Sequence, residues 1–132
     1  RRTMPLALAI DANRYVDLAR GDPHAAQVIA SAERVVVPFI VLAELRAGFR
    51  GGTRLENNER SLAAFLRLPG TSVAYADEAT THFYAELAVE LERAGKPIPK
   101  NDLWIAAIVL QHDLVLFSRD RHFDAVPRIA RI

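Results

Sequence analysis

The amino-acid sequence predicts an α/β fold, with a parallel β-sheet that helices cover on both faces. Three short apolar runs, at 6–10, 35–37 and 114–117, lack the polar alternation of strands that face water. Longer segments with helical spacing of their apolar residues separate these runs. Buried strands that are joined through helices are typical of parallel sheets between two helical layers.

An aspartate stands at the end of the first predicted strand, and another stands at the start of the first predicted helix. The strand at the start of the chain ends at Asp11. A helix is predicted further along, because Asp22 can cap a helix and Pro23 suits the first helical turn. The second strand covers 35–37 and ends at Pro38, so we expect a buried β-branched strand there.

Two further helices are predicted before a third, weaker strand. The segment 39–49 has helical spacing and is closed by the glycines at 51–52. Thr53 and Glu56 form the pattern of a capping box, which predicts the start of the next helix. The third strand is expected at 73–75.

The second half of the chain is predicted to hold two helices and two strands. A long helix is expected over 77–94, and Asn101 is expected to cap the helix that follows. A fourth strand covers 114–117, and a short edge strand is expected near 128–132. The long helix has one apolar face with a spacing of four, formed by Phe83, Leu87 and Leu91.

Composition limits the class of protein. The 132 residues, 51% of them hydrophobic, fit one packed domain. The absence of cysteine excludes disulfides and thiolate metal sites. A formal charge of +1 means that any nucleic acid must be held by a local patch. Since no apolar run approaches the roughly 18 residues of a membrane span, we expect a cytoplasmic protein with no membrane partner.

Acidic residues follow the predicted strands. Asp11 and Asp120 come after the first and fourth strands, Glu44 lies in an apolar helix after the second, and Asp102 begins a helix. Each alone could be a helix cap or a surface charge. Ligands bind beyond the carboxyl ends of parallel strands, however, and carboxylates gathered there repel one another unless a cation lies between them.

Oxygen ligands without cysteine indicate Mg²⁺ or Mn²⁺ rather than zinc. Zinc would favour histidine or cysteine ligands, and the four histidines show no ligand spacing. His112 and His122 lie on either side of a predicted strand, so we expect both at the surface. The sequence therefore predicts a site for a hard divalent cation at one edge of the sheet.

The segments that carry these acids are, in order, Asp11 to Asn13, Ala43 to Gly48, Asn101 to Ala107 and Ser118 to Phe123. They resemble the four motifs of PIN-domain nucleases, and most closely the VapC-type toxins of bacterial toxin–antitoxin pairs. The resemblance implies a three-layer α/β/α sandwich with a central parallel sheet. It also implies a single PIN domain over 4–132, with Met4 as the native start, and a metal-dependent endoribonuclease that uses Mg²⁺ or Mn²⁺.

The resemblance also assigns roles to individual residues. Ser118 matches the hydroxyl residue before the last acid of the family, and Asn13 matches the small polar residue after the first. Both are expected to support the site through hydrogen bonds. His122 stands where some members carry another acid or an arginine, so a fifth carboxylate is absent. The implied metal ligands are Asp11, Glu44, Asp102 and Asp120.

Arginines beside these motifs are candidates for contacts with RNA phosphates, although each could equally pair with an acid. The candidates are Arg14, Arg46, Arg50, Arg119 and Arg121. The resemblance implies three partners: an RNA substrate, a cognate antitoxin and a second copy of the chain. It implies a homodimer that forms a heterotetramer or a larger assembly with the antitoxin.

Other classes of protein fit the sequence less well. A response-regulator receiver needs adjacent acids after its first strand, but Ala12 follows Asp11. A haloacid dehalogenase phosphatase needs Asp-x-Asp, and the second position here is Asn13. Two alternatives stay open: a PIN-domain RNA-processing nuclease with no toxin role, and a non-catalytic Mg²⁺-binding signalling or interaction module.

Overall fold

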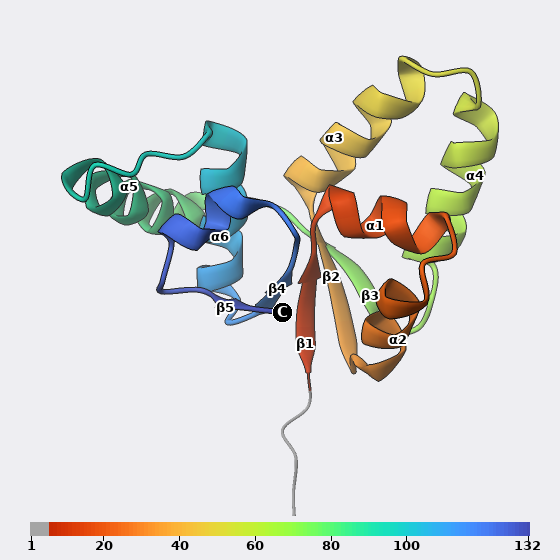
Figure 1. Cartoon of the computed structure of the whole chain (residues 1–132), viewed down its shortest axis with the longest axis horizontal. Helices are drawn as coiled ribbons and strands as arrows, with labels where there is room; N and C mark the ends of the chain where they lie inside the picture. The colour runs from red at the N-terminus through yellow and green to blue at the C-terminus, as the bar shows by residue number, and fades with distance from the viewer. Residues whose placement is uncertain (1–5) are drawn as a thin grey trace, which may run out of the picture.

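The computed structural model describes residues 6–132 (Figure 1), so Met4, the expected start of the domain, lies outside the described residues. The elements in chain order are β1 (Ala7–Ile10), α1 (Ala12–Ala19), α2 (Pro23–Ser31), β2 (Arg34–Pro38), α3 (Phe39–Arg50), α4 (Leu55–Leu66), β3 (Thr71–Ala74), α5 (Glu78–Arg93), α6 (Lys100–Gln111), β4 (Val115–Phe117), the 3-10 helix η1 (Arg121–Ala125) and β5 (Ala130–Arg131).

The five strands form one parallel sheet in the order β3-β2-β1-β4-β5. β1 lies in the middle, where Ala9 is in register with Val36 of β2 and with Leu116 of β4. Leu8 and Ile10 are fully buried, as expected of a central strand that is covered on both faces. The predicted parallel sheet is therefore confirmed.

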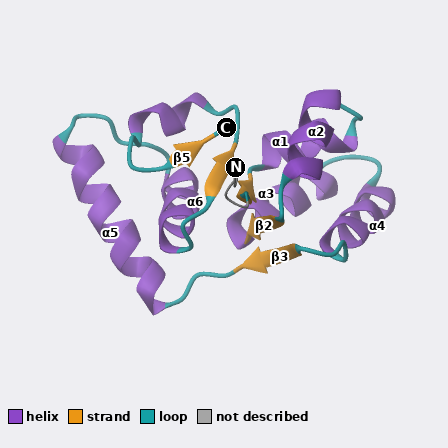
Figure 2. Cartoon of the chain, turned by 90° about the horizontal axis from the view of Figure 1, so that it is seen from below, coloured by secondary structure: helices purple, strands orange, loops and turns teal. Residues whose placement is uncertain are grey.

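Helices cover both faces of this sheet. Figure 2 shows α5 and α6 on one side of the strands and α1, α2 and α4 on the other. α3 continues from the end of β2 beyond the edge of the sheet, and α4 returns beside it (Figure 1). The three-layer arrangement that the resemblance implies is thus confirmed. Within 6–132, no helix is both long and apolar enough to cross a membrane.

The first helix is a feature that the sequence pattern did not predict. α1 begins directly after β1, because the Asp11 carboxylate accepts a hydrogen bond from the backbone N–H of Ala12 and caps the helix. Tyr15 is the only residue of α1 that is buried. Its apolar residues do have helical spacing, at Ala12, Tyr15, Val16 and Ala19. The helix has only eight residues, however, and is shorter than the window in which a helical period stands out from the sequence.

Three predicted boundaries are wrong. The capping box at Thr53 does not form: α4 has Arg54 at its N-cap, without a side-chain hydrogen bond. Asn101 is not a cap either, because α6 begins at Lys100 with Pro99 at its N-cap, where the fixed φ of proline suits the entry into a helix. The third strand covers Thr71–Ala74 instead of 73–75, since its pairing with β2 begins opposite Val35.

Gly70 connects α4 to β3 and packs closely against the backbone at the start of β2. It has a φ of +82°, its carbonyl accepts a hydrogen bond from the N–H of Val35, and a Cβ there would lie 2.8 Å from the Glu33 carbonyl oxygen. Gly21 has a φ of +83° but open space around it. We expect Gly21→Ala to lose about 1 kcal/mol of unfolding free energy from backbone strain alone.

Gly70→Ala should lose at least about 1 kcal/mol more than Gly21→Ala, because its Cβ would also force the backbone at Glu33 to move. Urea unfolding of both variants measures the difference. Equal losses would mean that the contact with Glu33 relaxes at no cost.

Candidate active site

Four acidic side chains lie on segments that meet at the carboxyl edge of the sheet. Asp11 follows β1, Glu44 lies in α3 after β2, Asp102 lies in the first turn of α6, and Asp120 follows β4. They are close enough to act on one another: Asp120 raises the pKa of Asp11 and of Asp102. Glu44 is affected by all of the other three. The acids expected from the sequence thus form one cluster.

The pairing of β1 with β4 brings Asp11 and Ser118 together. Ile10 is in register with Phe117, and the N–H of Asp11 donates to the Phe117 carbonyl at 3.0 Å. Both side chains are buried, and the Ser118 hydroxyl donates to Asp11 Oδ2 at 2.6 Å. Burial raises the pKa of Asp11, although the hydrogen bonds from Ser118 and Ala12 lower it.

Asn13 and the Ser118 hydroxyl link α1 to the segment after β4. The Asn13 amide nitrogen lies 3.5 Å from Asp11 Oδ2 and 3.4 Å from Ser118 Oγ, and its oxygen accepts from the Arg119 N–H at 3.3 Å. Ser118 Oγ also accepts from the N–H of Asp120 at 3.0 Å. These bonds fix the orientation of Asp11 and Asp120 relative to each other.

His122 completes the cluster, and the sequence analysis did not place it there. Its Nδ1 lies 2.8 Å from Asp102 Oδ2 and 3.1 Å from Asp120 Oδ1. The His122 side chain is 54% exposed and that of Asp102 only 11%. The hydrogen bond to Asp102 raises the pKa of His122. Burial raises the pKa of Asp102, and Asp120 raises it further.

A local signal for His122 is present in the sequence. Asp120 Oδ1 accepts a hydrogen bond from the His122 N–H at 2.9 Å, which caps η1. An aspartate that caps a turn in this way holds the residue two positions later close to its own carboxylate.

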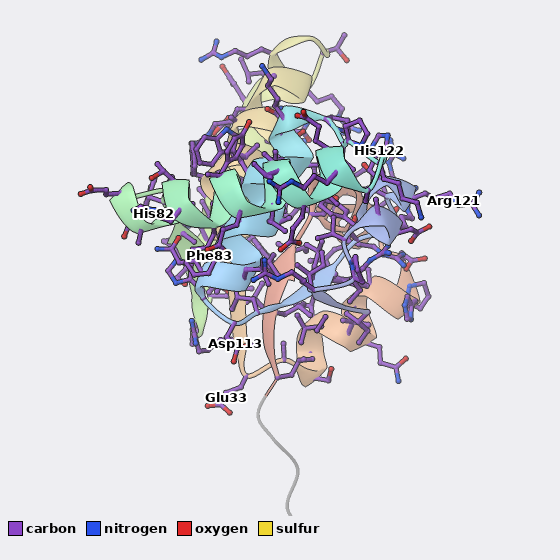
Figure 3. All side chains as sticks on the ribbon, turned by 90° about the vertical axis from the view of Figure 1, so that its left-hand side faces the viewer. Glu33, His82, Phe83, Asp113, Arg121 and His122 are labelled. Atoms are coloured by element: carbon purple, nitrogen blue, oxygen red, sulfur yellow. The ribbon has the colours of Figure 1, made fainter. Side chains whose placement is uncertain are left out.

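The position of His122 also shows where the cluster lies in the molecule. Figure 3 shows His122 far from Glu33, which lies near the amino end of the sheet.

Glu44 lies half-buried on α3. Burial raises its pKa most, the charge of Asp11 adds to this, and a hydrogen bond with Asn101 lowers it. Glu44 also borders a cleft of about 670 Å³ between α1, α3 and α4, together with Asn13 and Arg119. Of the four carboxyl groups, Glu44 is the one that lines this cleft.

Three of the arginines proposed to bind RNA have acidic partners in the structure. Arg119 makes two hydrogen bonds to Asp17, of 2.9 and 3.0 Å, and Arg14 lies 3.3 Å from the same carboxylate. The bond from Arg119 is the main cause that lowers the pKa of Asp17 to about 2. Arg46 pairs with Glu59 at 3.3 Å.

The chemistry of the cluster fits a bound metal ion. Buried carboxyl groups with raised pKa values favour a cation that offsets their repulsion. Single ligand atoms of Asp102, Asp120 and His122 all lie within 4.8 Å of one another. The set therefore offers carboxylate oxygens and one imidazole nitrogen, which supports a metal site.

The comparisons with known proteins agree with this arrangement. The family model described as "PIN domain" matches residues 8–129. Ribonuclease VapC5 of Mycobacterium tuberculosis is 25% identical over 98% of this chain and 95% of its own length. Ribonuclease VapC2 of Rickettsia felis is 30% identical over 78% of this chain and 76% of its own. The structure of VapBC-1 from nontypeable Haemophilus influenzae superposes with a TM-score of 0.84 and 26% identity, covering 96% of this chain and 97% of that one.

A parallel sheet with acids at its carboxyl edge, together with a match over nearly the whole chain, defines a PIN domain, and the chain belongs to that family. Within the family it is of the VapC type of ribonuclease toxin. The family resemblance read from the sequence is thereby confirmed.

Repulsion within the cluster gives a stability prediction. In chelator at pH 7, Glu44→Gln should unfold at a higher temperature than the wild type, because the uncharged amide removes one charge from the crowded site. A raised pKa means that ionised Glu44 destabilises the folded state above that pKa. The gain should shrink as the pH falls through the raised value, and it should vanish below about the ordinary value of 4.5.

The matched control is Glu33→Gln, at an exposed glutamate near the opposite edge of the sheet (Figure 3). Thermal unfolding across this pH range measures both variants. A gain in the control equal to that of Glu44→Gln would mean that general surface charge, and not the cluster, is responsible.

Proposed function

We propose that the chain hydrolyses RNA phosphodiester bonds at the four-carboxyl cluster, with Mg²⁺ or Mn²⁺ as its cofactor. The observation that carries this proposal is the convergence of Asp11, Glu44, Asp102 and Asp120 from four separate segments. Burial, with a further contribution from neighbouring charges, raises the pKa of Asp11, Glu44 and Asp102. Similarity to ribonucleases along nearly the whole chain supports the choice of RNA as the substrate.

A bound divalent ion would lower the pKa of a water molecule and neutralise charge on the phosphoryl oxygens. In the proposed arrangement, Asp11 and Asp102 form the core of the metal site. Glu44 and Asp120 either hold a second ion or orient water. No separate general base is required.

The residues around the acids hold this arrangement in place. Ser118 donates to Asp11 Oδ2, and this hydrogen bond restricts the orientation of the Asp11 carboxylate. Asn13 contacts both groups and also binds the backbone after β4. We propose that both act by positioning the carboxylates, in the way that hydrogen bonds orient the ligands of metal sites in general.

RNA must also be held by cations. Arg121 is exposed and lies on the same turn as His122, so we propose it as a phosphate contact. Arg14, Arg46 and Arg119 remain candidates, but each would have to exchange a carboxylate for a phosphate. Arg119 is the most costly of these to move, because its two bonds to Asp17 match the planar fork of a guanidinium.

The decisive test is RNA cleavage by the purified protein with Mg²⁺ or Mn²⁺. We expect cleavage with either metal, none with chelator, and a rate more than about a hundredfold lower for Asp102→Asn, because a lost ligand should cost more than a lost supporting hydrogen bond. Asp102→Asn, purified identically, controls for contaminating nucleases, because a contaminant would remain active in it. Glu33→Gln, at an exposed glutamate outside the cluster, should retain the wild-type rate. Equal rates for Asp102→Asn and the wild type would exclude the proposed site.

For this VapC-type toxin, we further propose a cognate antitoxin and an assembly with it. An antitoxin that binds near the acids would restrain it, and two copies of the chain would join the antitoxin in a heterotetramer or larger assembly. The similarity to VapC ribonucleases and to the VapBC-1 structure supports this role.

Expression of the chain alone should stop the growth of a bacterial host, because cleavage of essential RNA is not restrained there. Asp102→Asn, expressed to the same level, should allow growth. Colony counts after induction measure the effect. Normal growth with a wild-type chain that cleaves RNA in vitro would favour the RNA-processing alternative over the toxin role.

A further inference from the structure

The geometry points to His122 as a direct metal ligand, which makes this site prefer first-row transition ions over Mg²⁺. This inference rests on the proposed function, since it concerns the metal of the same site. It adds a nitrogen ligand to a set that the sequence motifs describe as acids alone. The argument depends on where Nδ1 lies, on how firmly it is held there, and on what a nitrogen ligand does to metal preference.

The position of Nδ1 suits a shared ion. It lies 2.8 Å from Asp102 Oδ2 and 3.1 Å from Asp120 Oδ1. Neighbouring ligand atoms of a six-coordinate ion with bonds of about 2.1 Å are roughly 3.0 Å apart. Both distances from Nδ1 therefore match neighbouring corners of one coordination shell, and ligand atoms of the three residues all lie within 4.8 Å of one another. Without metal, the imidazole contacts both carboxylates, and the same nitrogen is placed where it could share an ion with them.

The three side chains are also held before any ion binds. Asp102 lies in α6 and is buried, which limits its side-chain freedom. Asp120 is tied at both ends, by its own N–H to Ser118 Oγ and by its carboxylate to the His122 N–H. The same bond fixes the backbone of His122 in the η1 turn. An ion would find the ligands largely in place, and the exposed side of His122 leaves room for water and a phosphate.

Nitrogen changes which ion is preferred. Carboxylates suit Mg²⁺ and Mn²⁺ alike, whereas imidazole binds transition ions much better than Mg²⁺. A site that adds His122 to the carboxylates should therefore bind Mn²⁺ more tightly than Mg²⁺ by a wider margin than an acid-only site does. Ions further along the transition series should bind more tightly still.

The test uses Mn²⁺ as the probe on the full chain. Pulsed electron spin resonance of the Mn²⁺-loaded wild type should show coupling to a nitrogen nucleus, and the coupling should change when the protein is made with ¹⁵N-histidine. The coupling should disappear in His122→Asn. It should persist in His82→Asn, a matched control at an exposed histidine on α5, far from His122 in Figure 3.

Calorimetry gives the second readout. We expect His122→Asn to weaken Mn²⁺ binding by about tenfold or more and Mg²⁺ binding by less than about threefold. Equal weakening of both ions, or no nitrogen coupling in the labelled wild type, would overturn the assignment. The labelled wild type needs no substitution, so the test holds even if His122→Asn folds poorly.

The outcomes also separate this inference from the proposed function. Mn²⁺ that binds without nitrogen coupling, and is lost in Asp102→Asn, would leave the metal site standing and remove only His122 from it. Mn²⁺ that does not bind, or binds equally well in Asp102→Asn, would overturn the metal site and the inference together.

Discussion

The pairing of β1 with β4 is the constraint on which the site depends. These strands are more than a hundred residues apart in sequence, yet their register places Ile10 beside Phe117 at the last position of each. The next residues, Asp11 and Ser118, must then meet, and their hydrogen bond of 2.6 Å follows from the backbone alignment. A shift of one residue in this register would turn one of the two side chains to the other face of the sheet.

Bringing these carboxyl groups together and burying them lowers the stability of the metal-free fold. Burial raises the pKa of Asp11, Glu44 and Asp102, so each carboxylate is less stable here than in water. The fold tolerates this loss of stability because the strands and α6 contribute many apolar side chains to the buried core. His122 offsets part of the repulsion between Asp102 and Asp120 in the absence of metal. Residues that weaken the metal-free fold are those that we propose bind the cation.

The sequence predicts the fold well because its strongest signals are the signals of this architecture. Apolar runs of strand length and acids just after them identify the sheet and its functional edge without knowledge of contacts. α1 escapes notice because its eight residues are fewer than the window in which a helical period stands out. The expected caps at Thr53 and Asn101 fail because Arg54 and Pro99 occupy those N-cap positions. His122 escapes because its partner Asp102 lies 20 residues away, and only the packing of η1 against α6 unites them.

Arg119 shows why proximity to a motif does not determine a role. From sequence it is a basic residue within an acidic motif, and so a candidate for RNA. In the structure its side chain points to Asp17 on α1, while its backbone N–H binds Asn13. A single exposed ion pair contributes little to stability. This one is bidentate and is shared with Arg14, whose guanidinium also lies 4.7 Å from the centre of the Phe117 ring. The network ties the segment after β4 to α1, close to the strand pairing that brings Ser118 to Asp11. A place in the motif therefore does not separate a phosphate contact from an ion pair within the fold, because the same guanidinium fork suits a phosphate and the Asp17 carboxylate alike.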